Sequence, residues 1–147
     1  MPPLLTWFGD DFTGSAAVME VLAFAGIKTV LFSGIPDETL HARFADARAI
    51  GIASTARTHG PEWMAQNLPA PLTWLDRLNA PILHYKVCST FDSSPTSGSI
   101  GKAVEIGLSV RNAQAVPVLT AAPQMRRYQA FGHLFAGTLD GVFRLDR

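Results

Sequence analysis

Three polar segments of the sequence carry the residue types that bind or activate small, oxygen-rich molecules. They read GDDFTG at residues 9–14, STARTHG at 54–60 and KVCSTFDSSPTSGS at 86–99. The third segment is longer than a plain connection between two elements, which takes about two to six residues. It is also dense in hydroxyl groups. We therefore expect it either to be a flexible linker or to surround a small polar ligand.

The first segment places two carboxylates, Asp10 and Asp11, before an apolar helical pattern. Helix capping accounts for one of them, because an Asp satisfies free N–H groups and suits the positive end of the helix. A second carboxylate can accept hydrogen bonds from ligand hydroxyls, hold Mg²⁺ or take a proton from an alcohol. The adjacent spacing excludes the phosphatase motif in which one residue separates two Asp residues.

Two cations accompany these carboxylates. The fork of Arg57 matches the two oxygens of a substrate carboxylate, although a plain surface arginine is the alternative. Lys86 ends an apolar run, where its ammonium either meets a carboxylate or oxyanion or simply closes an edge strand. We interpret His59 as a loop histidine and expect Arg126 and Arg127 to face solvent.

The common nucleotide-binding motifs are missing from the third segment. Gly101 and Lys102 fit a Walker A loop, but Thr96 stands where its first glycine belongs and Ala103 replaces the Ser or Thr. The GxGxxG spacing is absent as well. Hydroxyl and N–H groups near a helix start therefore suit a small polar ligand.

Strand-like and helix-like patterns alternate along the chain, which predicts βαβ units. The fold class is then α/β, with a mostly parallel sheet and helices on both faces. We predict strands at residues 4–8, 29–32, 47–53, 81–87, 116–120 and 141–145. We predict helices at residues 14–25, 61–68, 72–78, 100–108 and 128–135. In the first helix, Val18, Val21, Leu22 and Ala25 are expected on the buried face.

This architecture predicts where the polar segments lie. Ligands of open parallel sheets bind at the carboxyl ends of the strands. We therefore expect the three segments, together with residues 120–127, to meet at one edge of the sheet.

Composition narrows the partners. The net charge is zero and no basic run occurs, so neither nucleic acid nor an anionic membrane is expected as a partner. No apolar stretch has the length that spans a bilayer, and the N-terminus lacks a signal-peptide pattern. Cys88 is the only cysteine, which excludes an internal disulfide and fits a cytoplasmic location.

Several motifs, in their order along the chain, resemble the four-carbon acid sugar kinase family. They are GDDFTGS, VMEVLAFAG, KVCSTFDSSP, GSIGKA and RLDR. The family was long catalogued as a domain of unknown function and was sometimes labelled type III effector Hrp-dependent outer protein. The resemblance covers the whole chain, so residues 1–147 are expected to form the N-terminal sugar-acid-binding domain. It implies a separate C-terminal nucleotide-binding domain that this chain lacks.

What the resemblance implies is ATP-dependent phosphorylation of a hydroxyl on a four-carbon sugar acid of the threonate or erythronate type. ATP and Mg²⁺ would be the cofactors, bound mostly outside this chain, and no metal site is expected within it. By the resemblance, Asp10 and Asp11 are catalytic carboxylates that meet substrate hydroxyls, and Arg57 binds the substrate carboxylate. The remaining substrate-binding residues would be Lys86, Ser89, Thr90 and Asp92.

Other functions stay open at this point. A non-catalytic sugar-acid-binding domain, or a degenerate fragment, would form the same pocket without transfer. A secreted effector is disfavoured, because it predicts a Ser-rich N-terminal signal where MPPLLTWFGDD reads as a buried strand. We expect the chain alone to be inactive. We also expect it to form a homo-oligomer through apolar surface around Phe131, Phe135 and Phe143.

Overall fold

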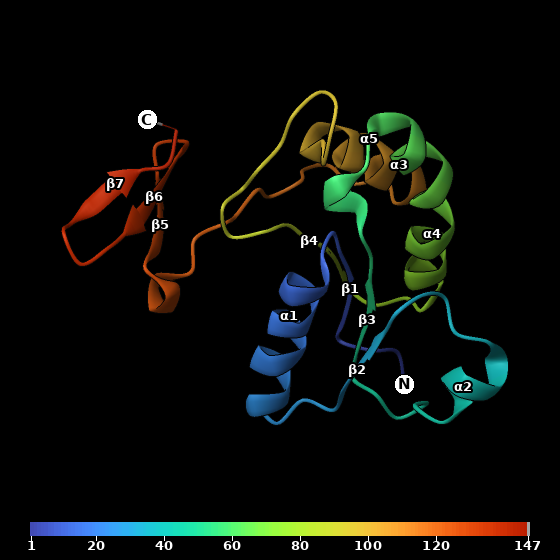
Figure 1. Ribbon diagram of the computed structural model, residues 1–147. Helices are drawn as coiled ribbons and strands as arrows, with labels where there is room; N and C mark the ends of the chain where they lie inside the picture. The colour runs from blue at the N-terminus through green and yellow to red at the C-terminus, as the bar shows by residue number, and fades with distance from the viewer. Residues whose placement is uncertain (147) are drawn as a thin grey trace.

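A four-stranded parallel sheet forms the centre of the protein in the computed structural model, which describes residues 1–146 (Figure 1). The strand order is β2-β3-β1-β4, and every neighbouring pair is parallel. The strands are β1 (Leu5–Gly9), β2 (Thr29–Phe32), β3 (Ala49–Ala53) and β4 (Ile82–Lys86). The central strand β3 is buried along its whole length, as expected for a parallel sheet that is covered on both faces.

Helices cover both faces of this sheet, which confirms the predicted α/β class. Helix α1 (Phe12–Phe24) packs against β1, β2 and β3, and α4 (Pro69–Arg77) packs against β1 and β3. Helices α3 (Pro61–Asn67) and α5 (Ile100–Val110) pack around α4, while the short α2 (Glu38–Ala42) follows β2. The main core lies between the sheet and α3, α4 and α5. Its fully buried members include Phe8, Ile52, Met64, Leu68, Leu72 and Leu75.

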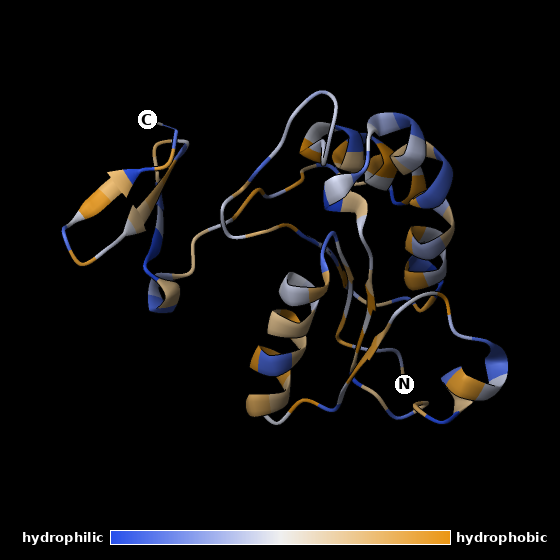
Figure 2. Ribbon diagram, in the orientation of Figure 1, coloured by the Kyte–Doolittle hydropathy of each residue, from blue (hydrophilic) through white to orange (hydrophobic). Residues whose placement is uncertain are grey.

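The buried face of α1 differs from the predicted one. Ser15 is fully buried and Val18 and Leu22 are partly buried, whereas Val21 is 64% exposed and Ala25 is exposed as well. Apolar residues occupy much of the surface of α1 (Figure 2), so their spacing alone does not determine its rotation. The close approach of Ser15 to the end of β1 determines which side faces the sheet.

A second, smaller sheet lies to one side of this unit (Figure 1). It is antiparallel, with the order β5-β6-β7, and consists of β5 (Arg127–Ala130), β6 (His133–Gly137) and β7 (Val142–Arg144). The predicted strand at 141–145 is thereby confirmed. The predicted helix at 128–135 is wrong, because Phe131 and Gly132 have φ of 50° and 75° and form a two-residue hairpin turn.

The predicted strand at residues 116–120 is wrong as well. This segment has no regular structure, and Val116, Val118 and Leu119 are exposed. Pro117 has no N–H to give to a sheet, and β4 remains the edge strand of the parallel sheet.

The apolar surface predicted around the small sheet is exposed only in part. Phe131 and Phe143 are exposed, while Phe135 is half-buried. Within residues 1–146, none of the helices combines the length and apolarity needed to cross a membrane.

Candidate functional site

The loops that follow β1, β3 and β4 meet at the carboxyl edge of the parallel sheet, as predicted. The main-chain N–H of Arg57 donates to the Asp10 carbonyl at 3.0 Å, and the N–H of Asp10 donates to the Lys86 carbonyl at 3.0 Å. The Ser54 hydroxyl donates to the Gly9 carbonyl at 2.8 Å. These bonds join the three loops through main-chain carbonyls, so the fold itself fixes where their side chains start.

The fourth segment, residues 120–127, does not leave a strand of this sheet. It contains the short 3₁₀ helix η2 (Pro123–Met125) and leads into β5. Arg126 donates from Nη1 to the Thr138 carbonyl at 3.0 Å, so it stabilises the small sheet.

Asp11 is the N-cap of α1 and also an ion-pair partner. Its Oδ1 accepts from the Gly14 N–H, as a helix N-cap requires. Its Oδ2 lies 3.2 Å from Nη1 of Arg57. The structure therefore shows the capping role of Asp11, together with an ion pair to Arg57.

Asp10, the first Asp of the GDDFTG motif, has no hydrogen-bond donor to its side-chain oxygen Oδ1 in the part of the chain that the structure describes. The residue is only 4% exposed, and Oδ1 is buried with no hydrogen-bond partner in the described range 1–146. Burial raises the pKa of Asp10 to about 6, and the Asp11 carboxylate adds to the rise, while Lys86 and Arg57 act against it. A buried carboxylate with a free oxygen and such a pKa is suited to accept a proton from a ligand hydroxyl.

Lys86 adds a positive charge to the same edge. Its ammonium donates to the Val87 carbonyl and lies over the first turn of α1, beside Gly14. The attraction of Lys86 for the Asp10 carboxylate offsets part of the rise in the pKa of Asp10, so the two side chains interact electrostatically.

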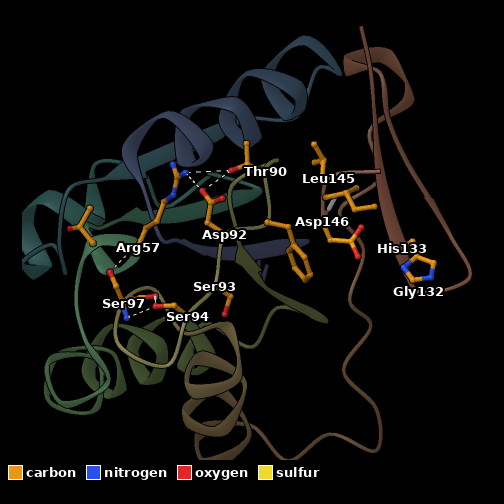
Figure 3. A pocket seen from close by; sticks show the side chains of 13 residues that line it. Arg57, Thr90, Asp92, Ser93, Ser94, Ser97, Gly132, His133, Leu145 and Asp146 are labelled. Carbon is orange, nitrogen blue, oxygen red and sulfur yellow. Dashed lines mark hydrogen bonds and ion pairs between the residues drawn. The ribbon is translucent and has the colours of Figure 1, made fainter. Parts of the chain in front are cut away.

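Arg57 connects the loop after β1 to the long loop after β4, and Figure 3 shows its contacts with Thr90 and Asp92. While Nη1 binds Asp11, Nη2 binds Asp92 and lies 3.4 Å from the Thr90 hydroxyl. The Thr90 hydroxyl donates to Asp92 at 2.8 Å. The hydrogen bond with Asp92 raises the pKa of Arg57, and the bond with Arg57 lowers the pKa of Asp92.

Hydrogen bonds order the long loop after β4, so the structure favours the ligand-surrounding interpretation over a flexible linker. The Gly98 N–H donates to the His59 carbonyl at 2.9 Å, and the Ser94 N–H donates to the Ser97 carbonyl at 3.1 Å. Gly98 has φ of 57°, and a Cβ there would lie 2.5 Å from the carbonyl oxygen of Arg57. Only glycine fits this close approach.

A pocket of about 870 Å³ opens between this loop and the small sheet (Figure 3). From the large unit it is lined by Arg57, Thr90, Asp92, Ser93, Ser94 and Ser97, among others. Asp10, Asp11 and Lys86 do not line it, and neither does Ser89, which is half-buried on the same loop.

The opposite wall of the pocket includes His133 and Asp146. Sequence reasoning missed both residues: it assigned the stretch around His133 to a helix, and it did not connect Asp146, after the predicted strand at 141–145, with the three polar segments. Gly132, between two short runs, was the one turn-forming residue there, and the large Phe131 before it is not a typical residue of such a turn.

No cluster of three or more His, Cys, Asp or Glu side chains suitable for a metal ion occurs in the described part of the chain. Asp10 and Asp11 are the carboxylates nearest the sheet edge. One or two carboxylates typically hold Mg²⁺ only together with substrate phosphates and water. These residues alone therefore do not form a complete Mg²⁺ site.

Comparison with known sequences identifies the family. The sugar-binding N-terminal domain family matches residues 5–145. A 3-oxo-isoapionate kinase of Paraburkholderia graminis is 50% identical over 145 residues, which cover 98% of this chain and 31% of that protein. A 3-oxo-tetronate kinase of Cupriavidus necator is 35% identical over 136 residues, covering 92% of this chain and 31% of that protein. The chain spans about a third of the length of these relatives.

Solved structures share the fold. A protein from Salmonella typhimurium LT2 superposes with a TM-score of 0.78 at 22% identity, covering 97% of this chain and 32% of that one. A domain from Bordetella bronchiseptica, crystallised with citrate as a domain-swapped dimer, gives a TM-score of 0.75 at 21% identity. That match covers 92% of this chain and 33% of the other. The match over residues 5–145 confirms the resemblance of the motifs, and the chain belongs to the family of sugar-binding N-terminal domains.

Proposed function

We propose that this chain is the part of an ATP-dependent kinase that binds a sugar acid and presents one of its hydroxyl groups for phosphorylation. The observation that carries the proposal is the buried Oδ1 of Asp10, which has no donor among the described residues. It lies at a sheet edge that also holds Arg57 and Lys86. A ligand with hydroxyl groups and a carboxylate could donate a hydrogen bond to Asp10 and accept hydrogen bonds from Arg57 and Lys86.

The names of the relatives support a narrower substrate class. Two kinases that match nearly the whole of this chain act, by name, on 3-oxo-isoapionate and 3-oxo-tetronate. We therefore propose a 3-oxo sugar acid as the substrate. Plain threonate and erythronate are useful analogues, because they keep the carboxylate and hydroxyl groups.

In the proposed reaction, the hydroxyl oxygen of the sugar acid forms a bond to the γ-phosphorus of ATP while the bond from that phosphorus to the ADP oxygen breaks. Asp10 takes the proton of the hydroxyl, and ADP leaves. Phosphoryl transfer depends mainly on positioning and charge stabilisation, and Asp10 is fixed by the main-chain bonds of its loop. Arg57 would hold the substrate carboxylate through its fork. Lys86, with the Ser89 and Thr90 hydroxyls, would complete the contacts to the sugar acid.

ATP would supply the phosphoryl group, and Mg²⁺ would neutralise the charge on its phosphates. We place most of the donor site outside residues 1–147, because the Walker A and GxGxxG patterns are absent from the sequence. The acceptor would then meet the donor in a cleft between this domain and a nucleotide-binding domain.

Calorimetry with threonate, erythronate and a 3-oxo sugar acid tests the acceptor site. Arg57→Ala should abolish measurable binding, because a buried ligand carboxylate without its partner is costly. Arg43→Ala is the matched control, since Arg43 is an exposed arginine at the end of α2. Equal affinity of the wild-type chain for a sugar acid and for its uncharged amide would contradict the proposal.

A further inference from the structure

We propose that Asp92 sets the selectivity of this site for carboxylates: in the free protein it occupies the outer edge of the Arg57 guanidinium, and a ligand carboxylate displaces it. The inference rests on the proposed function, since it names the step by which the sugar acid gains access to Arg57. It assigns Asp92 a role different from that of an ordinary contact to the substrate.

The first support is that both terminal nitrogens of Arg57 already have partners in this structure. Nη1 is bound by Asp11 and Nη2 by Asp92 and Thr90. A carboxylate that binds a guanidinium through two parallel hydrogen bonds needs two N–H groups on one edge. A guanidinium has five N–H groups, and a ligand carboxylate that binds across Nη1 and Nη2 competes there with the two Asp side chains.

The two Asp side chains differ in how firmly they are fixed. Asp11 also caps α1 through the Gly14 N–H, and its side chain is 22% exposed. The side chain of Asp92 is 57% exposed, and its hydrogen bonds within the described chain are those to Arg57 and Thr90. Displacing Asp92 costs one exposed ion pair, which is worth little. Displacing Asp11 would also remove a helix cap.

The charges around Arg57 favour a ligand carboxylate that replaces Asp92 over one that binds in addition to it. Asp10, Asp11 and Asp92 provide three carboxylates around two cations, Arg57 and Lys86. A further anion would add to an excess of negative charge. Replacement of Asp92 by a ligand carboxylate leaves the number of carboxylates paired with Arg57 unchanged.

The position of Asp92 agrees with this role. Arg57, Thr90 and Asp92 line the pocket, whereas Asp10, Asp11 and Lys86 do not (Figure 3). The Arg57–Asp92 pair therefore lies on the side from which a ligand in the pocket would approach. A simple carboxylate in the pocket would bind through this exchange alone, whereas a sugar acid also offers hydroxyl groups to the Thr90, Ser93 and Ser94 side chains that line it.

The experiment compares Asp92→Asn and Asp92→Ala with two control variants. Asp46→Asn removes a carboxylate from an exposed ion pair with Lys28, remote in sequence and absent from the pocket lining. Asp146→Asn removes a carboxylate from the opposite wall of the same pocket, where it pairs with Arg144. Neither Asp46 nor Asp146 contacts Arg57. The two controls therefore separate the loss of the Arg57–Asp92 ion pair from the loss of a negative charge alone.

Acetate serves as the carboxylate probe and acetamide as its uncharged counterpart. Binding is followed by ¹⁵N NMR of the Arg57 side chain, with the signal assigned through its loss in Arg57→Lys. We expect both Asp92 variants to bind acetate about three- to tenfold more tightly than the wild type. In these variants acetate no longer has to break an exposed ion pair, and one negative charge that repels it is gone. Acetamide binding should not change, Asp46→Asn should match the wild type, and Asp146→Asn should gain less than either Asp92 variant. Calorimetry with threonate should give the same ranking.

Three results would overturn the inference. One is weaker acetate or threonate binding in Asp92→Asn, which would make Asp92 a direct ligand contact. Another is an equal gain in Asp146→Asn, which would indicate a general charge effect. The third is an identical Arg57 signal in the ligand-free wild type and Asp92→Ala, which would show that the pair does not form. Absence of any sugar-acid binding, with the acetate ranking intact, would instead contradict the proposed function.

Discussion

The main-chain N–H of Arg57 donates a 3.0 Å hydrogen bond to the main-chain carbonyl of Asp10. The loop after β3 is thus fixed to the loop after β1 by atoms that no side-chain substitution removes. The guanidinium can therefore be altered without releasing the loop that carries it. Variants at Arg57 report on the side chain, not on the position of the loop.

Arg57→Lys should lower the affinity for a sugar acid by at least about tenfold. Lysine keeps the charge but lacks the rigid fork that binds two carboxylates and Thr90 at once, and a hydrogen bond to a charged group contributes about 1.5–3 kcal/mol. The thermal midpoint should change little, because the main-chain bond to Asp10 remains. Calorimetry and thermal unfolding of this variant and of Arg43→Lys measure both quantities. Wild-type affinity in Arg57→Lys would rule out recognition by the fork.

Asp10→Asn should stabilise the ligand-free protein at high pH and not at low pH. The pKa of Asp10 is about 6 in the folded protein, above its ordinary value of 3.8. The folded state therefore binds more protons between these values, and stability from this group falls as pH rises through them. We expect a gain of about 1–3 kcal/mol at pH 8 and almost none at pH 3.5, since one pKa unit corresponds to about 1.36 kcal/mol.

Urea unfolding at the two pH values measures this difference. Asp46→Asn is the control, because the pKa of Asp46 is shifted in the opposite direction: a hydrogen bond from Lys28 lowers it. Its contribution is present at high pH and is lost as pH falls, so the control should gain nothing at pH 8. A loss of stability in Asp10→Asn at pH 8 would show that the buried carboxylate is satisfied in a way the structure does not contain.

The two adjacent Asp residues should have different effects on catalysis. In a complete kinase of the family that carries the GDDFTG motif, replacing the first Asp by Asn should lower kcat by about 10²–10⁴, the range for loss of a general base. The second Asp should matter less, because Asn also caps a helix well. Steady-state kinetics at saturating substrate compare the two. A larger kcat loss at the second position would transfer the base role to Asp11.

Much of the site was predictable because it depends on the ends of parallel strands. Runs such as LTWFG and AIGIA are apolar enough to identify buried strands, and parallel strands bring their following loops to one edge. Asp10, Asp11, Arg57 and Lys86 could therefore be grouped from the sequence alone. The individual pairings were not predictable, since the ion pair of Arg57 with Asp92 depends on how a long loop folds back.

The small sheet was predictable only in part: the strand at 141–145 was predicted, whereas β5 and β6 were assigned to a helix. Strands of four and five residues are too short for periodicity alone to separate strand from helix. The turn residue Phe131 has a positive φ, a conformation that a large aromatic residue does not signal. The pocket residues around His133 were missed for this reason.

Gly98→Ala should destabilise the protein by about 1–3 kcal/mol, the usual cost of strain at such a backbone position. The added Cβ would lie 2.5 Å from the Arg57 carbonyl oxygen at a φ of 57°, so the long loop has to move away from Arg57. Sugar-acid affinity should fall together with stability. Gly34→Ala is the control, because a Cβ there would meet no atom within 4 Å. Unchanged unfolding and binding in Gly98→Ala would show that this loop does not depend on its contact with Arg57.

Residues 1–147 alone should bind a sugar acid without phosphorylating it. Transfer of a phosphoryl group requires a positioned donor and cations around its phosphates, and the described part of the chain contains no metal-binding cluster of acidic or His and Cys side chains. Binding the acceptor alone leaves the entropic cost of bringing the donor to it. A coupled assay for ADP release, with Mg²⁺, ATP and each sugar acid, should therefore give the same background rate for the wild type and for Asp10→Asn. Release of ADP that depends on the sugar acid and is lost in Asp10→Asn would place a working donor site within this domain, and the proposed division of the kinase would then be wrong.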